Sequence, residues 1–447
     1  MIKIYDTMTR SLRDFVPLTE NVVNMYVCGP TVYNYIHIGN ARSAVAFDTI
    51  RRYFEYCGYT VNYISNFTDV DDKIIKAANE AGISTKELSD KFIAAFMEDT
   101  GQLGIKPATQ NPRVINYMDE IIAFVSTLVD KGFAYVSEGD VYFRVAKSNN
   151  YAKLANKTLE DLEIGASGRT DAETERKENP LDFALWKAAK EGEVSWDSPW
   201  GPGRPGWHIE CSVMATEILG DTIDIHGGGV DLEFPHHTNE IAQSEAKTGK
   251  TFANYWIHNG FVNVDNEKMS KSLGNFVTVH DMLQTVDGQV LRFFLATQQY
   301  RKPINFTEKA IHDAEVNLKY LKNTHSLPLT DQVNQAELQT YLDAFQEAMD
   351  DDFNTANGVT VLFDMAKWIN SGNYDQTVKD AFEKMLQVFG IVFEEEVLDE
   401  DIEKLIEERQ AARANKDFAT ADRIRDELAA QGIKLLDTKE GVRWTRD

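Results

Sequence analysis

The chain has 447 residues, 43% of them hydrophobic and 26% charged, a length that suggests two to four domains. Its 71 acidic and 46 basic side chains give a net charge of −25, which alone argues against a nucleic-acid partner because phosphates need local Lys and Arg. We find no secretory leader, no apolar run of membrane-spanning length and only three scattered cysteines, so we expect a cytoplasmic protein without disulfides or a membrane partner.

The first elements predict a parallel sheet. Residues 22–28 are typical of a short buried strand, and residues 60–69 predict a second strand. Between them, a segment closed by Gly58 carries apolar groups at helical spacing, namely Ala41, Val45, Phe47, Ile50 and Phe54. A strand–loop–helix–strand unit of this kind opens a nucleotide-binding α/β sheet.

The next stretch predicts helices and then an insertion. Helical patterns cover about 71–100 and 112–131, and a β-hairpin over 133–145 turns at Glu138-Gly139-Asp140. The polar segment that follows contains Gly, Pro and charge clusters. We interpret about 132–206 as an insertion into the sheet domain.

The sheet is expected to resume after the insertion. A strand over 222–226 runs into Gly227-Gly228-Gly229, and a helix begins after Pro235 and continues to about Lys247. Short strands over about 255–264 lead into a polar loop, NEKMSKSLGN. A catalytic sheet domain is therefore expected over 1–307.

The last third is predicted to be helical. Few Gly or Pro interrupt residues 308–393, which favours a helical bundle, and an acidic run at 394–403 indicates a linker. An amphipathic helical pattern over 402–431 and a small β-like tail complete a terminal domain at 400–447. Residues 401–447 carry ten basic and eleven acidic groups, a net of −1, so this tail escapes the general acidity and could approach RNA. A solvated mixed-charge helix is the alternative.

The first candidate site is His37-Ile38-Gly39-Asn40, between the first strand and its helix. Backbone N–H groups and the helix dipole at such a place favour a phosphate. Gly39 lets the backbone come close to a ligand, while His37 and Asn40 add hydrogen-bond donors. By itself, a His-Gly pair on a loop is weak evidence for such a site.

The second candidate is Lys268-Met269-Ser270-Lys271-Ser272, in a polar stretch closed by Gly274. Two lysines three residues apart, interleaved with two serine hydroxyls, suit a mobile clamp on a triphosphate. Their ammonium groups would stabilise the leaving pyrophosphate as it gains charge. An exposed basic loop without a ligand is the alternative.

The two motifs together resemble the paired signatures of class I aminoacyl-tRNA synthetases. The resemblance implies ATP-binding roles for His37, Gly39, Asn40, Lys268, Ser270 and Lys271 and catalytic roles for His37, Asn40, Lys268 and Lys271. The fourth residue of the first signature is usually His in that family and is Asn40 here. An amide cannot carry charge near neutral pH, so any charge-dependent role at this position is in question, although it can still bond to the nucleotide.

Further stretches are similar to cysteinyl-tRNA synthetases over essentially the whole chain: MYVCGPTVYNYIHIG, NFTDVDDKI, GWHIEC, GGGVDLEFPHHTNEIAQ and AMDDDFNT. This resemblance implies one zinc ion per chain, bound by Cys28, Cys211, His236 and Glu240. The residue chemistry agrees, because Cys28 ends a strand at the mouth of the sheet and His236 and Glu240 share one helix face. Cys57 matches no motif and is expected to be a small core residue.

The resemblance also implies a substrate pocket. Trp207 would form one wall of this pocket. The alternative is that the Trp207 indole is buried in the hydrophobic core. Thr68 and Asp231 would hold the polar head of the amino acid, Asp231 facing its ammonium, although Asp231 could be only a turn residue. His226 and the glycine run would let the backbone approach the ligand, and His237 is left outside the site.

The expected fold is therefore α/β: a Rossmann-like parallel-sheet domain with an inserted region, then a helical bundle and a small anticodon-binding domain. The expected activity joins cysteine to its tRNA through an adenylate, with Mg²⁺–ATP, L-cysteine and tRNA as partners and a monomer as the working form. In the tail, Trp444 with Arg443 and Arg446 would contact tRNA, or Trp444 would only pack the small domain. A cysteine ligase acting on an amino-sugar, and a non-catalytic zinc-containing RNA-binding paralogue, are the alternatives.

Overall fold

The computed structural model describes residues 1–166, 174–270, 272–331, 333–394, 400–438 and 441–446. The chain divides into two compact units, Met1–Val392 and Phe393–Asp447. Among the described residues, we find no helix with the length and apolarity needed to cross a bilayer.

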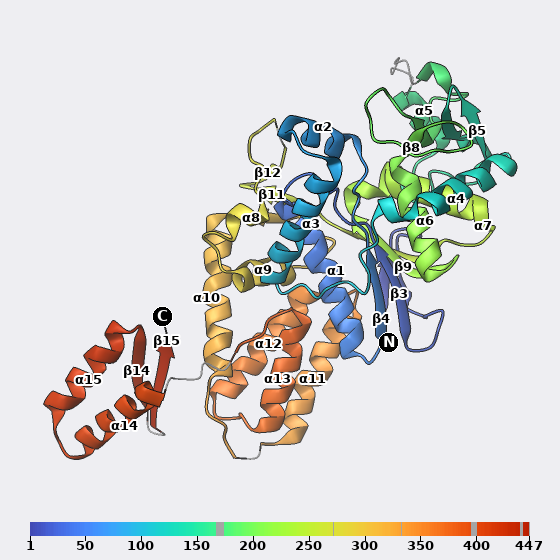
Figure 1. Cartoon of the computed structure of the whole chain (residues 1–447). Helices are drawn as coiled ribbons and strands as arrows, with labels where there is room; N and C mark the ends of the chain where they lie inside the picture. Colours follow the sequence, from blue (N-terminus) through green and yellow to red (C-terminus); the bar gives the residue numbers. More distant parts are fainter. Residues whose placement is uncertain (167–173, 271, 332, 395–399, 439–440, 447) are drawn as a thin grey trace. The chain divides into compact units, whose positions relative to one another are not determined.

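A four-stranded parallel sheet in the order β10-β9-β3-β4 lies at the centre of the first unit. Figure 1 shows β3, β4 and β9 side by side, with α1 running beside them. The strands are β3 (Val22–Val27), β4 (Thr60–Ser65), β9 (Ile223–Gly229) and β10 (Ala253–Asn259). Both halves of the predicted sheet are thus present, and their carboxyl ends meet at one edge.

Helix α1 (Ile38–Tyr56) connects β3 to β4 and buries the predicted apolar face, including Val45, Phe47 and Ile50. It ends as predicted before Gly58, whose φ of 92° suits a glycine. The prediction that Cys57 is a core residue is wrong, because its side chain is exposed. Cys57 caps the end of the helix, where the core-facing positions are already taken by Tyr53 and Phe54.

Beyond β4, the helical pattern predicted over 71–100 forms two helices, α2 (Asp72–Ala81) and α3 (Thr85–Gln102). Gly82, in the left-handed conformation at φ 66°, ends α2 and Ser84 caps α3. The next helix is α4 (Met118–Asp130).

The insertion contains an antiparallel sheet in the order β5-β6-β7-β8. Its elements are β5 (Ala134–Ser137), β6 (Asp140–Phe143), α5 (Leu159–Ala166), β7 (Phe183–Ala188) and β8 (Gly203–Pro205). The predicted hairpin turn is confirmed, since Glu138 and Gly139 both have positive φ. One hydrophobic core joins this sheet to α4, α6 (Trp207–Leu219) and α7 (Thr238–Thr248), so the insertion is packed onto the helices that carry the site.

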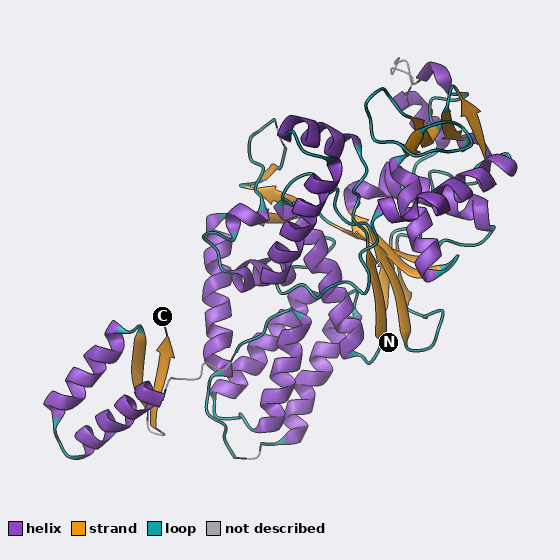
Figure 2. Cartoon of the chain, viewed as in Figure 1, coloured by secondary structure: helices purple, strands orange, loops and turns teal. Residues whose placement is uncertain are grey.

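Smaller elements complete the first unit, and Figure 2 shows how helices dominate its later part. A hairpin (β1, Lys3–Asp6; β2, Ser11–Asp14) precedes the sheet, and β11 (Val262–Val264), β12 (Glu267–Lys268) and β13 (Ile304–Phe306) form a small sheet beside the polar loop. The remaining helices are α8 (Val279–Met282), α9 (Gly288–Ala296), α10 (Glu308–His325), α11 (Gln335–Asp350), α12 (Thr355–Asn370) and α13 (Gln376–Val388). The last four agree with the predicted bundle.

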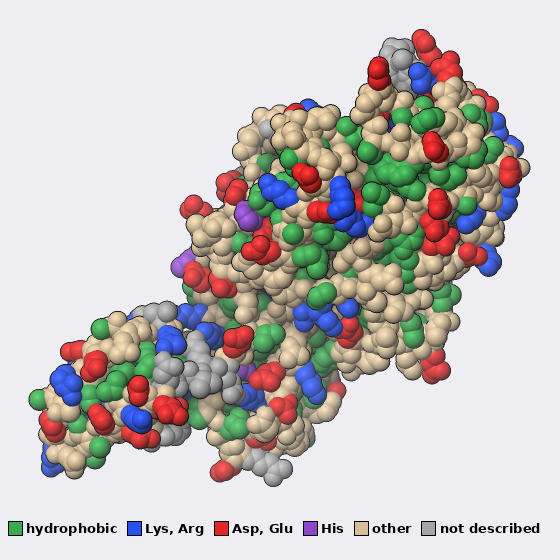
Figure 3. All heavy atoms as spheres, viewed as in Figure 1, with side chains coloured by type: hydrophobic (Ala, Val, Ile, Leu, Met, Phe, Trp, Pro, Cys, Tyr) green, Lys and Arg blue, Asp and Glu red, His purple; other side chains and the backbone are tan. Residues whose placement is uncertain are grey.

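The second unit pairs two helices with a hairpin: α14 (Glu400–Ala414), α15 (Phe418–Ala430), β14 (Ile433–Thr438) and β15 (Gly441–Arg446). The pattern predicted over 402–431 is two helices, broken where Lys416 has φ 62° and Asp417 caps α15. The acidic run predicted as a linker is helical from Glu400, and residues 395–399 lie outside the described residues. Acidic and basic side chains are interspersed on the visible face of this unit (Figure 3).

Candidate active site

A cavity of about 600 Å³ opens at the carboxyl ends of the central strands, the edge where open parallel sheets bind ligands. Its walls include residues from both signature motifs, from the expected metal site and from the expected substrate pocket. They are His37, Gly39, Asn40, Lys268, Met269, Cys28, Cys211, His236, Thr68, Trp207 and Asp231. One cavity therefore brings together groups as far apart in the chain as Cys28 and Met269.

At the nucleotide end of the cavity, His37 caps the N-terminus of α1. The His37 Nδ1 atom accepts the N–H of Asn40 at 3.2 Å, and Asn40 Oδ1 accepts the N–H of His37 at 3.2 Å. This reciprocal cap needs only an amide oxygen at position 40, which an asparagine supplies without any charge. A side chain at Gly39 would come within 2.8 Å of the His37 ring, so glycine is needed there.

The polar loop lies against this helix start. The N–H of Ile38 donates to Val277 O at 3.0 Å, and the ring of Phe276 lies 4.8 Å from that of His37. Lys268 is exposed on β12 at the cavity wall, and the N–H of Ser270 donates to Asn275 Oδ1. Lys271 lies outside the described residues. The two predicted signatures are therefore neighbours, as the ATP-binding prediction requires.

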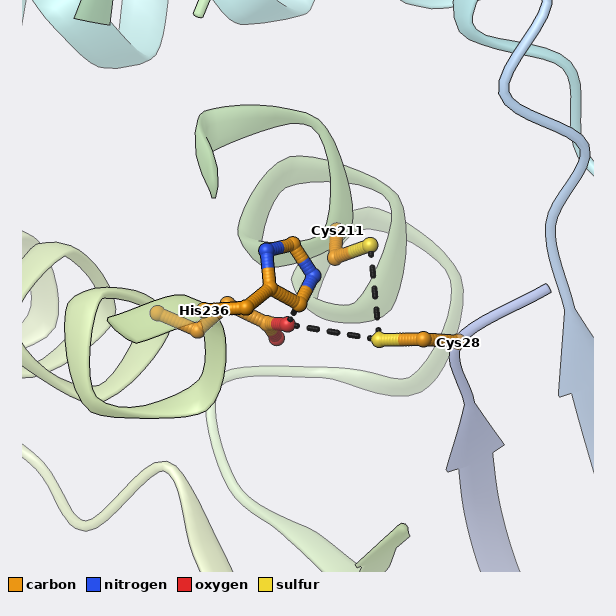
Figure 4. A group of neighbouring side chains, drawn as sticks. Cys28, Cys211 and His236 are labelled. Carbon is orange, nitrogen blue, oxygen red and sulfur yellow. Dashed lines mark hydrogen bonds and ion pairs between the residues drawn. The ribbon is translucent and has the colours of Figure 1, made fainter. Parts of the chain in front are cut away.

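At the other end of the cavity, four potential metal ligands converge from separate segments: Cys28 after β3, Cys211 in α6, His236 before α7 and Glu240 in α7. Their ligand atoms all lie within 4.8 Å of one another. Figure 4 shows the side chains of Cys28, Cys211 and His236 turned toward a common point. The Cys28 and Cys211 sulfurs are 3.6 Å apart, and His236 Nε2 is 2.9 Å from Glu240 Oε1.

Burial and mutual charge set the protonation of these groups. Burial alone would lower the pKa of His236, but the charge of Glu240 and hydrogen bonds to Cys211 and Glu240 raise it to about 10. Burial alone would raise the pKa of Glu240, but the charges of His226 and His236 lower it to about 2. A hydrogen bond from Cys28 lowers the pKa of the Cys211 thiol to about 6. The pKa values of Cys211 and Glu240 favour their anionic forms, whereas burial raises the pKa of the Cys28 thiol and His236 must lose its proton before it can bind a metal. By their chemistry, two sulfurs, an imidazole and a carboxylate fit a thiophilic divalent cation such as zinc.

Two histidines outside the predicted ligand set also reach this cluster. His226 Nε2 lies 2.6 Å from Glu240 Oε2, and His237 Nε2 lies 3.4 Å from Cys28 Sγ. With Cys28 and Glu240 they form a second possible donor group. The prediction left His237 out of the site, as a residue beside a ligand that could be exposed or only support the site from behind. Residues 233–237 are not regular α-helix, with Phe234 in an extended conformation, and this turns His237 inward.

Of the residues predicted for the pocket, Trp207, Thr68, Asp231 and Gly229 line the cavity, whereas the buried His226 does not. Trp207 is 44% exposed, so it is not a buried core indole, and its ring stacks on His236 with centroids 4.5 Å apart. Thr68 is buried at 3% exposure, whereas Asp231 is exposed in a short 3-10 helix (Val230–Leu232) after the glycine run. A molecule bound in the cavity is therefore within reach of Trp207 at the metal end and of Thr68 and Asp231 along the cavity wall.

In the second unit, Trp444 is half-buried and packs against a small core formed by Ile402, Ile424, Leu428 and Ile433. Arg443 and Arg446 flank it on β15, and Arg446 is exposed. The structure therefore supports the alternative in which the Trp444 indole packs the small terminal domain. Its contact with RNA stays a prediction.

The parallel sheet, with a His-Ile-Gly-Asn helix start and a Lys-Met-Ser loop at one cavity, defines a class I aminoacyl-tRNA synthetase fold. The same fold is found in methionyl-tRNA synthetase structures from Mycobacterium tuberculosis, with TM-scores of 0.60 and 0.55, 15% and 14% identity, and coverage of 82% of this chain and 89% and 88% of those chains. Residues 14–316 match the family model for the tRNA synthetases class I (C) catalytic domain, 344–394 a DALR domain, and 395–444 a cysteinyl-tRNA ligase anticodon binding domain.

Relatives of the whole chain narrow this class further. The chain is 95% identical to a cysteine–tRNA ligase of Streptococcus thermophilus and 83% identical to one of Streptococcus pyogenes serotype M6, in both cases over 100% of each chain. The chain belongs to the cysteine–tRNA ligase family.

Proposed function

We propose that this chain attaches cysteine to its tRNA in two ATP-dependent steps. The observation that carries the proposal is the shared cavity, with nucleotide signatures at one end and a sulfur, imidazole and carboxylate cluster at the other. Membership of the cysteine–tRNA ligase family supports the same reaction. The match of residues 395–444 to an anticodon-binding model argues against an amino-sugar acceptor, and the intact signatures argue against a non-catalytic paralogue.

In the first step, an oxygen of the cysteine carboxylate attacks the α-phosphorus of Mg²⁺–ATP, and the bond to pyrophosphate breaks. In the second, a ribose hydroxyl of the terminal tRNA adenosine attacks the acyl carbon, loses its proton, and releases AMP. Neither step needs a protein nucleophile. Positioning and charge stabilisation are enough.

The nucleotide end would stabilise the charge that develops on the phosphates. His37 and Asn40 would donate hydrogen bonds beside the positive end of α1, while Gly39 admits the nucleotide. Lys268 and Lys271 would neutralise the leaving pyrophosphate, and Ser270 would bond to its oxygens. The exposure of Lys268 on a short strand leaves its ammonium able to reach a triphosphate.

Cys28, Cys211, His236 and Glu240 would hold one zinc ion. When bound, a thiophilic ion supplies a bonding position for the substrate thiolate, for which serine's poorly ionising hydroxyl and alanine's methyl are poor substitutes. Shape alone would separate amino acids that differ by one methylene by only about 1–3 kcal/mol. Trp207, stacked on His236, would close the side-chain pocket, with Thr68 and Asp231 holding the polar head of the amino acid.

The second unit would bind the anticodon region of tRNA. Arg443 and Arg446 would contact phosphates, and Trp444 would support the hairpin that carries them or stack on a base. We expect the chain to work as a cytoplasmic monomer.

Cysteine-dependent ATP–pyrophosphate exchange, with zinc content measured on the same samples, tests the proposal. Cys28→Ala should lose both zinc and exchange activity, because it removes a ligand. Cys57→Ala is the matched control, since this exposed cysteine lies outside the cavity and should change neither. A Cys28→Ala enzyme with normal zinc and normal exchange would overturn the metal assignment.

The role of the metal in selectivity has its own test. Replacing zinc by an ion that binds sulfur weakly should reduce the preference for cysteine over serine in the exchange assay. Unchanged selectivity would show that the pocket walls discriminate without the metal.

A further inference from the structure

The side chain of Asn66 lies between the ends of β3 and β4, where three parts of the site meet. It is 1% exposed. Asn66 Oδ1 accepts the N–H of Gly29 at 2.9 Å, Asn66 Nδ2 lies 3.2 Å from Thr68 Oγ1, and Oδ1 lies 3.8 Å from Cys211 Sγ. One amide thus contacts the residue after Cys28, a second proposed metal ligand and the proposed contact for the substrate head.

The orientation of this amide follows from its partner. A backbone N–H can only donate, so the atom that faces Gly29 must be the amide oxygen. The amide nitrogen therefore faces Thr68, and as a donor it takes a lone pair of the Thr68 hydroxyl. The hydroxyl proton of Thr68 is then left to donate to another acceptor, and Thr68 lines the cavity.

The backbone around Asn66 holds this arrangement in place. The N–H of Thr68 donates to Pro30 O and the N–H of Val32 donates to Thr68 O, both at 3.1 Å. A Cβ at Gly29 would lie 1.7 Å from Asn66 O, so the two segments pack more closely than any other residue at position 29 would permit. Thr68 cannot shift relative to Cys28 without breaking these contacts.

We infer that Asn66 is a positioning residue that fixes the Thr68 hydroxyl as a hydrogen-bond donor toward the α-carboxylate of the amino acid. The inference rests on the proposed function and deepens it. A donor suits the anionic carboxylate, whereas the exposed carboxylate of Asp231 suits the ammonium group. The polar head would thus be recognised by two groups of opposite character, which also sets the direction of the substrate in the cavity.

Calorimetry on the zinc-loaded full chain tests the inference by measuring the Kd of two ligands. One is L-cysteine, and the other is cysteamine, which keeps the thiol and the amine but lacks the carboxylate. In Asn66→Asp the carboxylate can only accept, so the Thr68 hydroxyl turns toward it and its donor is lost. The Kd of L-cysteine should rise about tenfold or more, while the Kd of cysteamine should not rise. Thr68→Val should give the same pattern.

The double variant separates polarity from charge. If Asn66 acts through the Thr68 hydroxyl, adding Asn66→Asp to the Thr68→Val variant should cause no further rise in the Kd of L-cysteine. Asn62→Asp is the matched control, because its amide also joins β4 to β3, by a 2.9 Å bond to Asn24, but it lies outside the cavity wall. The Kd values of L-cysteine and cysteamine should be unchanged in Asn62→Asp.

The outcomes are distinct. Equal weakening of L-cysteine and cysteamine in Asn66→Asp, or additive losses in the double variant, would overturn the positioning role. A zinc-loaded unmodified chain that binds neither ligand would instead refute the proposed function on which the inference rests. Zinc content and thermal midpoint, unchanged in each variant, would confirm that the effect is on ligand binding.

Discussion

Asp48→Asn should destabilise the first unit strongly, because the Asp48 carboxylate on α1 is shared by two arginines in a buried ionic network. Its Oδ2 atom lies 2.7 Å from Arg292 Nη1 and 2.8 Å from Arg52 Nε, and its Oδ1 atom accepts the N–H of Lys106 at 2.9 Å. The Arg292 side chain is fully buried and also donates to Phe389 O at the end of α13. The network therefore joins the bundle to α1, the helix that His37 caps.

The magnitude follows from the burial of Arg292. Removing the charge of Asp48 leaves a buried guanidinium without its counter-ion, and breaking such a pair typically costs about 3–5 kcal/mol. The matched control is Asp313→Asn, which breaks an ion pair with Lys309 whose side chains are 54% and 83% exposed. Asp313→Asn should lower the free energy of unfolding by less than about 1 kcal/mol.

Urea unfolding of the full chain, followed by far-ultraviolet circular dichroism, measures both changes. The free energy of unfolding of the first unit should fall far more in Asp48→Asn than in Asp313→Asn, with similar urea dependence. A difference of less than about 1 kcal/mol between the two variants would refute the reasoning, because the network would then contribute no more than a surface pair.

The pH dependence gives a second check on the same residue. Burial alone would raise the pKa of Asp48, but the charges of Arg292 and Arg52 outweigh it and hold the pKa below its ordinary value. A carboxyl with a depressed folded-state pKa stabilises the fold above its unfolded pKa, about 3.9, and loses that contribution as pH falls through the folded value. The stability gap between the unmodified chain and Asp48→Asn should therefore narrow below about pH 4 and stay constant near neutrality.

Three further predictions concern the site and the second unit. Lys268→Ala should lower the rate of ATP–pyrophosphate exchange by about 10²-fold with zinc content unchanged, and an unaffected rate would exclude Lys268 from the chemistry. Deleting residues 400–447 should weaken tRNA charging more than pyrophosphate exchange, whereas equal losses would indicate a purely structural tail. Trp444→Ala should destabilise the second unit by about 2 kcal/mol, measured by hydrogen exchange of its amides, while Arg446→Ala should affect only charging.

The order of elements could be predicted well because each depends on local periodicity. The apolar spacing of residues 41–54 predicted α1, and the apolar runs near 22 and 60 predicted its flanking strands. The chemistry of the site was also visible in the chain, since Cys28, Cys211, His236 and Glu240 stand in motifs with a clear family resemblance. Boundaries were less certain: the pattern over 71–100 contained a break at Gly82 that periodicity alone did not reveal.

Tertiary structure decided the properties that depend on contacts between distant segments. The exposure of Cys57, the inward turn of His237 and the packing of Trp444 each depend on what lies opposite them, which local sequence does not encode. The same holds for the Asn66 amide, whose direction is set by a backbone N–H 37 residues away. Residue types and their spacing determine which chemistry is available, whereas burial and the orientation of each donor arise only when the chain folds and brings its partners within bonding distance.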